Sequence, residues 1–336
     1  MIKPGPRNLI TDVPGLRVGN AEDKTALTGV TVILGDAPLT AGVDVRGGAP
    51  GNREISALDP ACLVNDVHAL VLAGGSVFGL AAADGVAVTL SARGVGLPLS
   101  PVTVPVVPGA ILYDLVNGGD KNWGEEPPYA ALGRRALASA HVDFAQGNAG
   151  AGLGAKAGSL KGGLGSASAT GADGIVVGAL AAVNSFGNAH APDGGFWAGY
   201  LEQGGEFGGL APLPLPRDGQ GVTLTPDFPK TPLLAANTSL GVVATNATLT
   251  KAEAERLAIM AQDGFARALR PVHTPFDGDT VFALSTRQVE LTGEHPLALA
   301  KLGALAADCL ARAVIHAVLA AESIGGMRAY RDVFRK

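Results

Sequence analysis

The chain has 336 residues, of which 47% are apolar and 16% charged, and its formal net charge is −5. A chain of this length can bury a large core without help from metals or disulfide bonds. Its lysines and arginines are scattered, and without a basic stripe we expect no nucleic-acid partner.

Glycine is the most unusual feature of the composition. The 48 glycines are about twice the average usage. Apolar runs separate them without a three-residue period, which indicates tight turns and close backbone approaches rather than collagen or disorder. Cys62 and Cys309 lie in apolar or helical surroundings, and we expect both to be buried free thiols. Residues 1–12 lack the apolar segment of a secretory signal, so we expect a cytoplasmic protein.

Apolar and β-branched runs predict strands and helices that alternate along the chain. In chain order we expect strands at 29–34 and 69–73, a helix at 76–92, strands at 175–183 and 239–245, a helix at 251–269, a strand at 280–286 and a helix at 296–321. Thr250 and Glu253 form a capping box at the start of helix 251–269, and Pro271 follows its end. The strands are apolar on both faces, which predicts a layered α/β sandwich.

The last helix is apolar on more than one side, so we expect it to be largely buried. Lys301, Asp308, Arg312 and His316 interrupt its apolar stretch, which argues against a membrane span and against a membrane partner.

One segment, residues 204–236, carries six prolines and many glycines with little periodicity. A long stretch of this kind inside a compact fold is usually functional or a linker. It leads to Asn237-Thr238 and then directly into the predicted strand 239–245.

Most common catalytic and cofactor signatures are missing from the sequence. It contains no Gly-x-Ser-x-Gly, Ser-x-x-Lys, His-Glu-x-x-His or Gly-x-x-x-x-Gly-Lys-Ser/Thr motif. The six histidines show no metal-ligand spacing, so we expect no metal and no cofactor. The turn Gly74-Gly75-Ser76 lacks the spacing of a dinucleotide fingerprint, and we interpret it mainly as a tight strand-to-helix turn.

Thr238 remains as a candidate nucleophile. A threonine hydroxyl needs a base beside it, and a free α-amine on the same residue is one such base. The reference pKa of that amine, about 7.7–8.0, suits a general base at neutral pH. An internal threonine gains the amine only when the preceding peptide bond is cut, here Asn237-Thr238. From the residues alone, Asn-Thr also fits an ordinary strand start.

Six segments resemble one family of self-cleaving enzymes. Residues 237–247 resemble the cleavage site and following strand of the β-peptidyl aminopeptidase / L-aminopeptidase–D-amino-acid esterase family, which includes the nylon-oligomer hydrolases. Segments 43–51, 72–76, 147–152, 161–165 and 277–280 resemble the family in the same order. The resemblance implies a four-layer αββα sandwich of the self-cleaving N-terminal-nucleophile-like type. It also implies one domain over 1–336, cut into subunits 1–237 and 238–336, and a homo-oligomer of cleaved protomers.

The same resemblance implies roles for several residues. Thr238 matches the nucleophile, and Asp277 and Asp279 match the acidic pair that hydrogen-bonds it in the nylon-oligomer branch. Asn184 matches the asparagine on the oxyanion side, and Tyr113 matches a pocket tyrosine. Taken alone, Asp277-Gly278-Asp279 and Asn184 would also fit polar turns, and Tyr113 would fit a core position.

The family also implies a catalytic lysine. Ser159 stands opposite the lysine of the nylon-oligomer branch, with Lys156 before it and Lys161 after it. We predict Lys161, because Lys161-Gly162-Gly163 is itself family-like.

We therefore expect a self-processing N-terminal-threonine hydrolase that releases N-terminal residues from small peptides, amides or esters. An ω-amino-acid (nylon-type) oligomer hydrolase and a self-cleaving acyltransferase are the alternatives. A hypothesis of another class is an uncleaved nucleotide-binding protein that uses the Gly74-Gly75-Ser76 turn and Lys161.

Overall fold

The computed structural model describes residues 2–171, 173–209 and 237–334. Its strands are β1 (Leu16–Asp23), β2 (Thr28–Val45), β3 (Asn52–Arg53), β4 (Val67–Ala73), β5 (Gly109–Ile111), β6 (Lys156–Ala157), β7 (Leu160–Lys161), β8 (Gly163–Thr170), β9 (Val176–Asn184), β10 (Thr238–Ala247) and β11 (Thr280–Val289). Its α-helices are α1 (Ala81–Ala92), α2 (Tyr129–Ala138), α3 (Lys251–Ala268), α4 (His295–Ala320) and α5 (Tyr330–Phe334).

Strand β2 joins two halves of one continuous sheet. The hydrogen-bonded order is β3-β5-β4-β2-β11-β10-β9-β8, and β1 pairs with β2. Residues 28–34 of β2 pair with β1 and β4, whereas residues 40–45 pair with β11. The pairing with β4 shifts register between Leu34 and Leu39, and an irregularity of this kind bends a strand.

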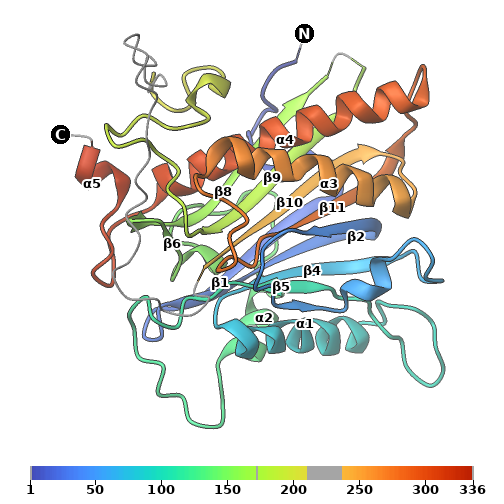
Figure 1. Ribbon diagram of the computed structural model, residues 1–336. Coiled ribbons are helices and arrows are strands. Elements are labelled where there is room, and N and C mark those ends of the chain that lie inside the picture. The colour runs from blue at the N-terminus through green and yellow to red at the C-terminus, as the bar shows by residue number, and fades with distance from the viewer. Residues whose placement is uncertain (1, 172, 210–236, 335–336) are drawn as a thin grey trace.

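The two halves of the sheet pack face to face, and helices cover both outer faces (Figure 1). The inner layer is built from apolar residues of both halves, including Ile33, Leu72, Leu180, Val242 and Phe282. Helices α3 and α4 cover the half that contains β8 to β11. Helices α1 and α2 cover the half that contains β1, β4 and the start of β2. The four-layer αββα sandwich is thus confirmed.

The predicted core elements agree with those observed. The five predicted strands lie within β2, β4, β9, β10 and β11, with shifts of a few residues at their ends. At the start of α3, the Thr250 hydroxyl accepts a hydrogen bond from the Glu253 N–H at 3.3 Å, and the Glu253 carboxylate accepts one from the Thr250 N–H at 2.8 Å. The helix predicted from residue 76 begins with a 3-10 turn, Ser76–Leu80, before α1. One expectation was wrong: both cysteines are free, but Cys62 is exposed and only Cys309 is buried.

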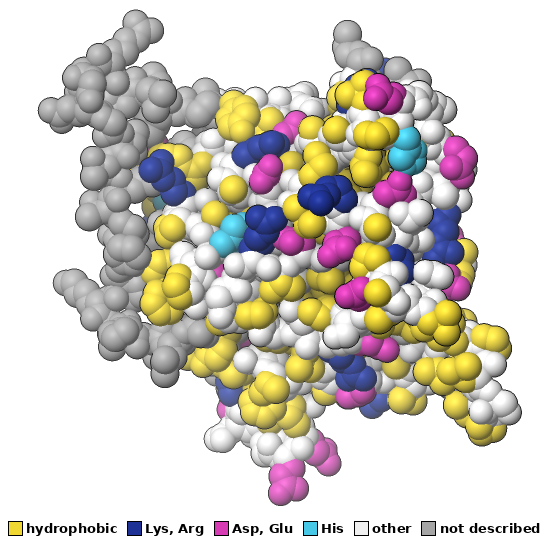
Figure 2. All heavy atoms as spheres, turned by 45° about the vertical axis from the view of Figure 1, so that its right-hand side comes forward, with side chains coloured by type: hydrophobic (Ala, Val, Ile, Leu, Met, Phe, Trp, Pro, Cys, Tyr) yellow, Lys and Arg dark blue, Asp and Glu magenta, His cyan; other side chains and the backbone are white. Residues whose placement is uncertain are grey.

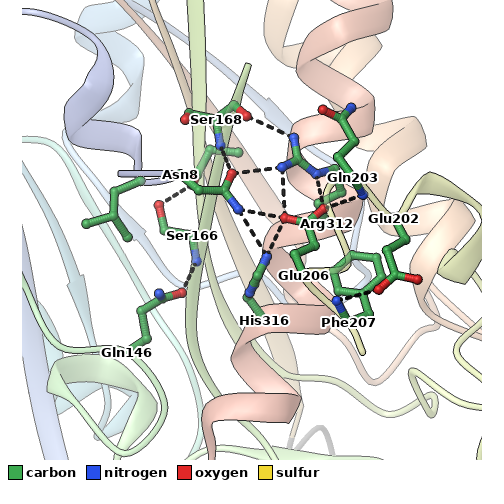
Figure 3. A network of polar contacts seen from close by, with 12 residues as sticks. Asn8, Gln146, Ser166, Ser168, Glu202, Gln203, Glu206, Phe207, Arg312 and His316 are labelled. Atoms are coloured by element: carbon green, nitrogen blue, oxygen red, sulfur yellow. Dashed lines mark hydrogen bonds and ion pairs between the residues drawn. The ribbon is translucent and has the colours of Figure 1, made fainter. Parts of the chain in front are cut away.

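Helix α4 is long and apolar enough by composition to cross a membrane, but most of it is buried inside the fold, as in the core helix of a globular domain. It also carries the fully buried Arg312 (Figure 3). The guanidinium donates to both carboxylate oxygens of Glu206 at 2.6 and 2.9 Å, to the Ser168 carbonyl at 2.9 Å and to Asn8 Oδ1 at 2.8 Å. His316 Nε2 lies 2.9 Å from the same carboxylate. A buried arginine is tolerated only with such partners.

This network ties together parts of the chain that lie on either side of the Asn237-Thr238 bond. Asn8, Ser168 and Glu206 precede that bond, and Arg312 and His316 follow it. Burial alone would raise the pKa of Glu206, but hydrogen bonds from His316 and Arg312 and their charges hold it at about 2. The carboxylate is therefore ionised at neutral pH and anchors residues 199–209 to α4.

Charges of both signs are interspersed on the molecular face in Figure 2, so that face carries no basic stripe.

Candidate active site

Thr238 is the first residue of β10 and is almost completely buried. Side chains alternate along a strand, and Thr238 shares its face with Leu240 and Val242 of the inner layer. The threonine hydroxyl therefore lies at the end of the space between the two sheet halves. It donates a hydrogen bond to the carbonyl oxygen of Asn237, the residue before it.

A second donor reaches the same carbonyl oxygen. Asn237 and Asp277 form a parallel β-bridge, and the Gly278 N–H donates to the Asn237 oxygen at 3.1 Å. A backbone N–H aimed at a carbonyl oxygen stabilises the negative charge that develops there when a nucleophile attacks. The carbonyl between Asn237 and Thr238 is thus polarised from two sides.

Glycine is required at position 278. A Cβ atom there would lie 2.6 Å from Thr238 Oγ1 and 2.7 Å from the Ala49 oxygen. Both distances are too short for a real contact, so a side chain at 278 would displace the threonine hydroxyl or the backbone.

Asp277 and Asp279 are both buried and hold the backbone around Thr238. Asp279 Oδ1 accepts from the Ser239 N–H at 2.8 Å, and its Oδ2 accepts from the His273 N–H at 3.0 Å. Asp277 accepts from the Phe186 N–H at 3.0 Å and from the Thr274 hydroxyl at 2.6 Å. Burial, followed by the neighbouring charge of Asp279, raises the pKa of Asp277 to about 6.

Asn184 is the last residue of β9 and pairs directly with Thr238 across the two antiparallel strands. Directly opposed residues project to the same face with Cβ atoms about 5 Å apart. Asn184 Nδ2 donates to the Tyr113 carbonyl oxygen at 2.9 Å, and Asn184 Oδ1 accepts from the Lys156 N–H at 2.9 Å. Tyr113 therefore meets Asn184 through its main chain rather than through its hydroxyl.

Lys161 is fully buried, and its hydrogen bonds are made to backbone carbonyl oxygens rather than to Thr238. Its ammonium group donates to the carbonyl oxygens of Gly152 at 2.7 Å, Gly162 at 2.9 Å and Ala155 at 3.0 Å. Burial lowers the pKa of Lys161 to about 7, against the opposing charge of Asp114. None of these three bonds reaches Thr238, so the geometry gives Lys161 a role in holding segment 152–162, and its direct part in the chemistry stays a prediction.

The turn after β4 binds the buried carboxyl group of Asp114. The Gly75 N–H donates to Asp114 Oδ1 at 2.7 Å, and the Thr28 hydroxyl donates to Asp114 Oδ2 at 2.7 Å. The ring of Tyr129 lies against Gly75. A turn that already binds a buried carboxylate is poorly suited to a phosphate, which disfavours the nucleotide-binding alternative.

The comparisons with known proteins identify the family of the chain. The sequence matches peptidase family S58 over residues 8–331. The chain belongs to this family. An uncharacterized aminopeptidase of Mycobacterium tuberculosis (strain ATCC 25618 / H37Rv) is 46% identical over 349 residues, which cover 97% of this chain and 98% of that protein. The 6-aminohexanoate-oligomer endohydrolase of Kocuria sp. (strain KY2) is 31% identical over 327 residues, which cover 93% of this chain and 86% of that enzyme.

A solved structure extends the likeness to the fold. The L-aminopeptidase D-Ala-esterase/amidase of Ochrobactrum anthropi, described as a variant of the Ntn-hydrolase fold, superposes with a TM-score of 0.70 at 25% identity. The match covers 96% of this chain and 89% of that one. The resemblance inferred from the six segments is confirmed, and the chain is a hydrolase of this peptidase family.

Several residues of the site escaped the sequence analysis. The Gly278 N–H, the Lys156 N–H and the side chain of Asn117, which donates to Asn184 Oδ1 at 3.1 Å, carry no local signal in the sequence. Only the bridge between residues 237 and 277 and the packing of loops against β9 bring these groups together. In the part of the chain that the structure describes, no cluster of three or more His, Cys, Asp or Glu side chains could hold a metal ion.

Proposed function

We propose that this member of family S58 cuts its own chain between Asn237 and Thr238 and then uses Thr238 as an N-terminal nucleophile. The observation that carries the proposal is the position of the Thr238 hydroxyl, held against the Asn237 carbonyl while the Gly278 N–H donates to the same oxygen.

The first stage is an acyl shift from nitrogen to oxygen. Thr238 Oγ1 attacks the Asn237 carbonyl carbon, and the Gly278 N–H stabilises the negative oxygen that forms. The bond between that carbon and the Thr238 nitrogen then breaks. The hydroxyl proton ends on the nitrogen, which becomes the α-amine. Water hydrolyses the remaining ester and releases the carboxyl group of Asn237.

The second stage acts on a substrate. The α-amine of Thr238 takes the hydroxyl proton as the oxygen attacks a substrate amide or ester, and the leaving amine or alcohol departs with a proton. We assign to Asn184, which lies opposite Thr238 on β9, the donation of an amide N–H to the developing oxyanion, an interaction often worth about 3–4 kcal/mol. Water then hydrolyses the acyl-enzyme. Asp279 holds the Ser239 N–H next to the nucleophile, and Asp277 holds the Phe186 N–H in the segment after Asn184.

The substrates that we propose are small peptides, amides or esters whose N-terminal residue is released. The aminopeptidase name of the mycobacterial relative supports this class. The second candidate, an ω-amino-acid oligomer, is supported by the 6-aminohexanoate-oligomer endohydrolase among the relatives and by the residues Thr238, Asp277 and Asp279.

Denaturing mass spectrometry of the purified protein tests the first stage. Cleavage before Thr238 predicts fragments of about 24 and 10 kDa from a chain of 33.6 kDa and 336 residues, the smaller beginning Thr-Ser-Leu-Gly. A single intact mass after long incubation at neutral pH would refute the proposal.

A substrate panel tests the second stage. Amino-acid anilides with α- and β-amino groups should release aniline if the enzyme is an aminopeptidase, whereas 6-aminohexanoate oligomers should be shortened if it is an oligomer hydrolase. Added acceptor amines distinguish hydrolysis from acyl transfer, because transfer would yield new amides in place of free acid.

A further inference from the structure

Asn117 lies in the loop after β5 and links two parts of the candidate site. Its Nδ2 donates to Asn184 Oδ1 at 3.1 Å and to the Gly154 carbonyl oxygen at 2.9 Å. Its own N–H donates to the Asp114 carbonyl oxygen at 3.1 Å, which fixes the loop beside the buried turn after β4. The side chain is partly buried.

The orientation of the Asn184 amide depends on what surrounds its oxygen. An asparagine amide carries an acceptor at one end and two donors at the other. Two N–H donors, Asn117 Nδ2 and the Lys156 main chain, converge on Asn184 Oδ1. A flipped amide would set its NH2 group against both donors, so the two contacts fix the donor end of Asn184 on the side of the Tyr113 carbonyl.

Asn117 also connects Asn184 to the segment that Lys161 holds. Lys161 binds the carbonyl oxygens of Gly152 and Ala155, and Asn117 binds the carbonyl of Gly154 between them. The segment then continues to the Lys156 N–H, the second donor to Asn184. Both donors on Asn184 Oδ1 are therefore held by one network of buried and partly buried hydrogen bonds.

We propose that Asn117 is a positioning residue for acyl transfer at Thr238, because its Nδ2 and the Lys156 N–H hold the Asn184 amide in one orientation directly opposite Thr238. This inference rests on the proposed function, in which Asn184 is the donor. Asn117 itself need not touch the substrate: it acts through Asn184.

Asn117→Asp is the most informative variant, because it keeps the shape of the side chain but replaces its NH2 group with an oxygen. That oxygen would face Asn184 Oδ1 and the Gly154 carbonyl oxygen, which are both acceptors. A double-mutant cycle with Asn184→Ala separates positioning from general support of the loop. The assay is kcat and KM on the best substrate of the panel, with the fraction of cut chain measured for each protein. Asn148→Ala serves as the control, since Asn148 Nδ2 also donates to a backbone carbonyl, that of Glu322 at 3.0 Å, outside the site.

Positioning predicts that N117D lowers kcat by about 10- to 100-fold with KM nearly unchanged, as expected when a reacting group is misplaced. N184A should lower kcat by about 100-fold or more, and N117D should have almost no further effect in the N184A background. N148A should match the wild type. If a variant cuts itself only in part, its kcat is calculated per cut chain from the fraction measured for that protein.

The outcomes that overturn the idea are distinct. Equal losses from N117D in both backgrounds would assign Asn117 to general loop support and refute positioning, while leaving the proposed function intact. A wild-type rate for N184A would refute the role of Asn184 and the positioning of its amide, even if Thr238 is confirmed as the nucleophile. If N117D does not fold, Asn117→Ser removes the same donor without adding a charge and is carried through the cycle instead.

Discussion

Adding one methyl group at Gly278 tests whether the close contact with Thr238 is essential. The Cβ of Gly278→Ala would start 2.6 Å from Thr238 Oγ1, whereas ordinary van der Waals contact begins at 3.4 Å. The hydroxyl or the backbone must therefore move by most of an ångström. Displacements of about 1 Å cost roughly 100-fold in rate, or about 2.7 kcal/mol of transition-state stabilisation. Since alanine keeps its N–H, the loss reports position rather than the missing donor.

Gly241→Ala is the matched control. Gly241 lies three residues after Thr238 in β10, and the three atoms nearest to its added Cβ belong to the side chains of Phe265, Val281 and Leu310, at 3.1 to 3.2 Å. Both variants overpack the core, at a cost of about 1–3 kcal/mol, but only Gly278→Ala strikes the nucleophile.

The assay is the fraction of cut chain at fixed times after refolding the denatured precursor, measured by denaturing mass spectrometry, with urea denaturation to check stability. Gly278→Ala should be cut about 100-fold more slowly than the wild type, and Gly241→Ala at nearly the wild-type rate. Wild-type cleavage of a folded Gly278→Ala protein would refute the reasoning, as would an equal slowing of both variants.

Three other predictions concern Thr238, Asp277 and the pair Arg312 and Glu206. Thr238→Ala should leave a single intact mass and Thr238→Ser should still be cut, because only the serine keeps a hydroxyl; cleavage of the alanine variant at the same bond would exclude Thr238 as the nucleophile. Burial and the charge of Asp279 raise the pKa of Asp277 to about 6 from 3.8, so its contribution to stability is complete below about pH 4 and is lost as the pH rises through 6. Asp277→Asn should abolish this loss, and urea denaturation from pH 4 to 7 would contradict the idea if the two curves ran parallel. Arg312→Met should destabilise the fold by about 3–5 kcal/mol because it leaves the Glu206 carboxylate buried without its partner, and the added change Glu206→Gln should restore much of that loss; a single variant within 1 kcal/mol of the wild type in chemical denaturation would refute it.

The sequence by itself was sufficient to predict the main strands and helices and to identify the family. Runs apolar on both faces predicted the buried strands β2, β4, β9, β10 and β11, because burial on both sides leaves no polar alternation. The capping box at Thr250 and Glu253 fixed the start of α3 through contacts only three residues apart. Asn237-Thr238, at the end of a proline-rich segment, was predicted as the cleavage site. The six ordered segments identified the family that the comparisons show.

Tertiary structure alone decided how the site is assembled. The partners of Asn184 Oδ1 come from residues 67 and 28 positions earlier in the chain, and the Gly278 N–H reaches Asn237 beside an isolated bridge between residues 237 and 277. The tertiary structure also directs the Lys161 ammonium group to three carbonyl oxygens, to which it donates hydrogen bonds, and leaves Cys62 exposed. Local patterns report propensity and periodicity, which depend on neighbours within a few residues. Hydrogen bonds across the sheet and its loops depend instead on register and layer packing, which exist only once the whole chain has folded.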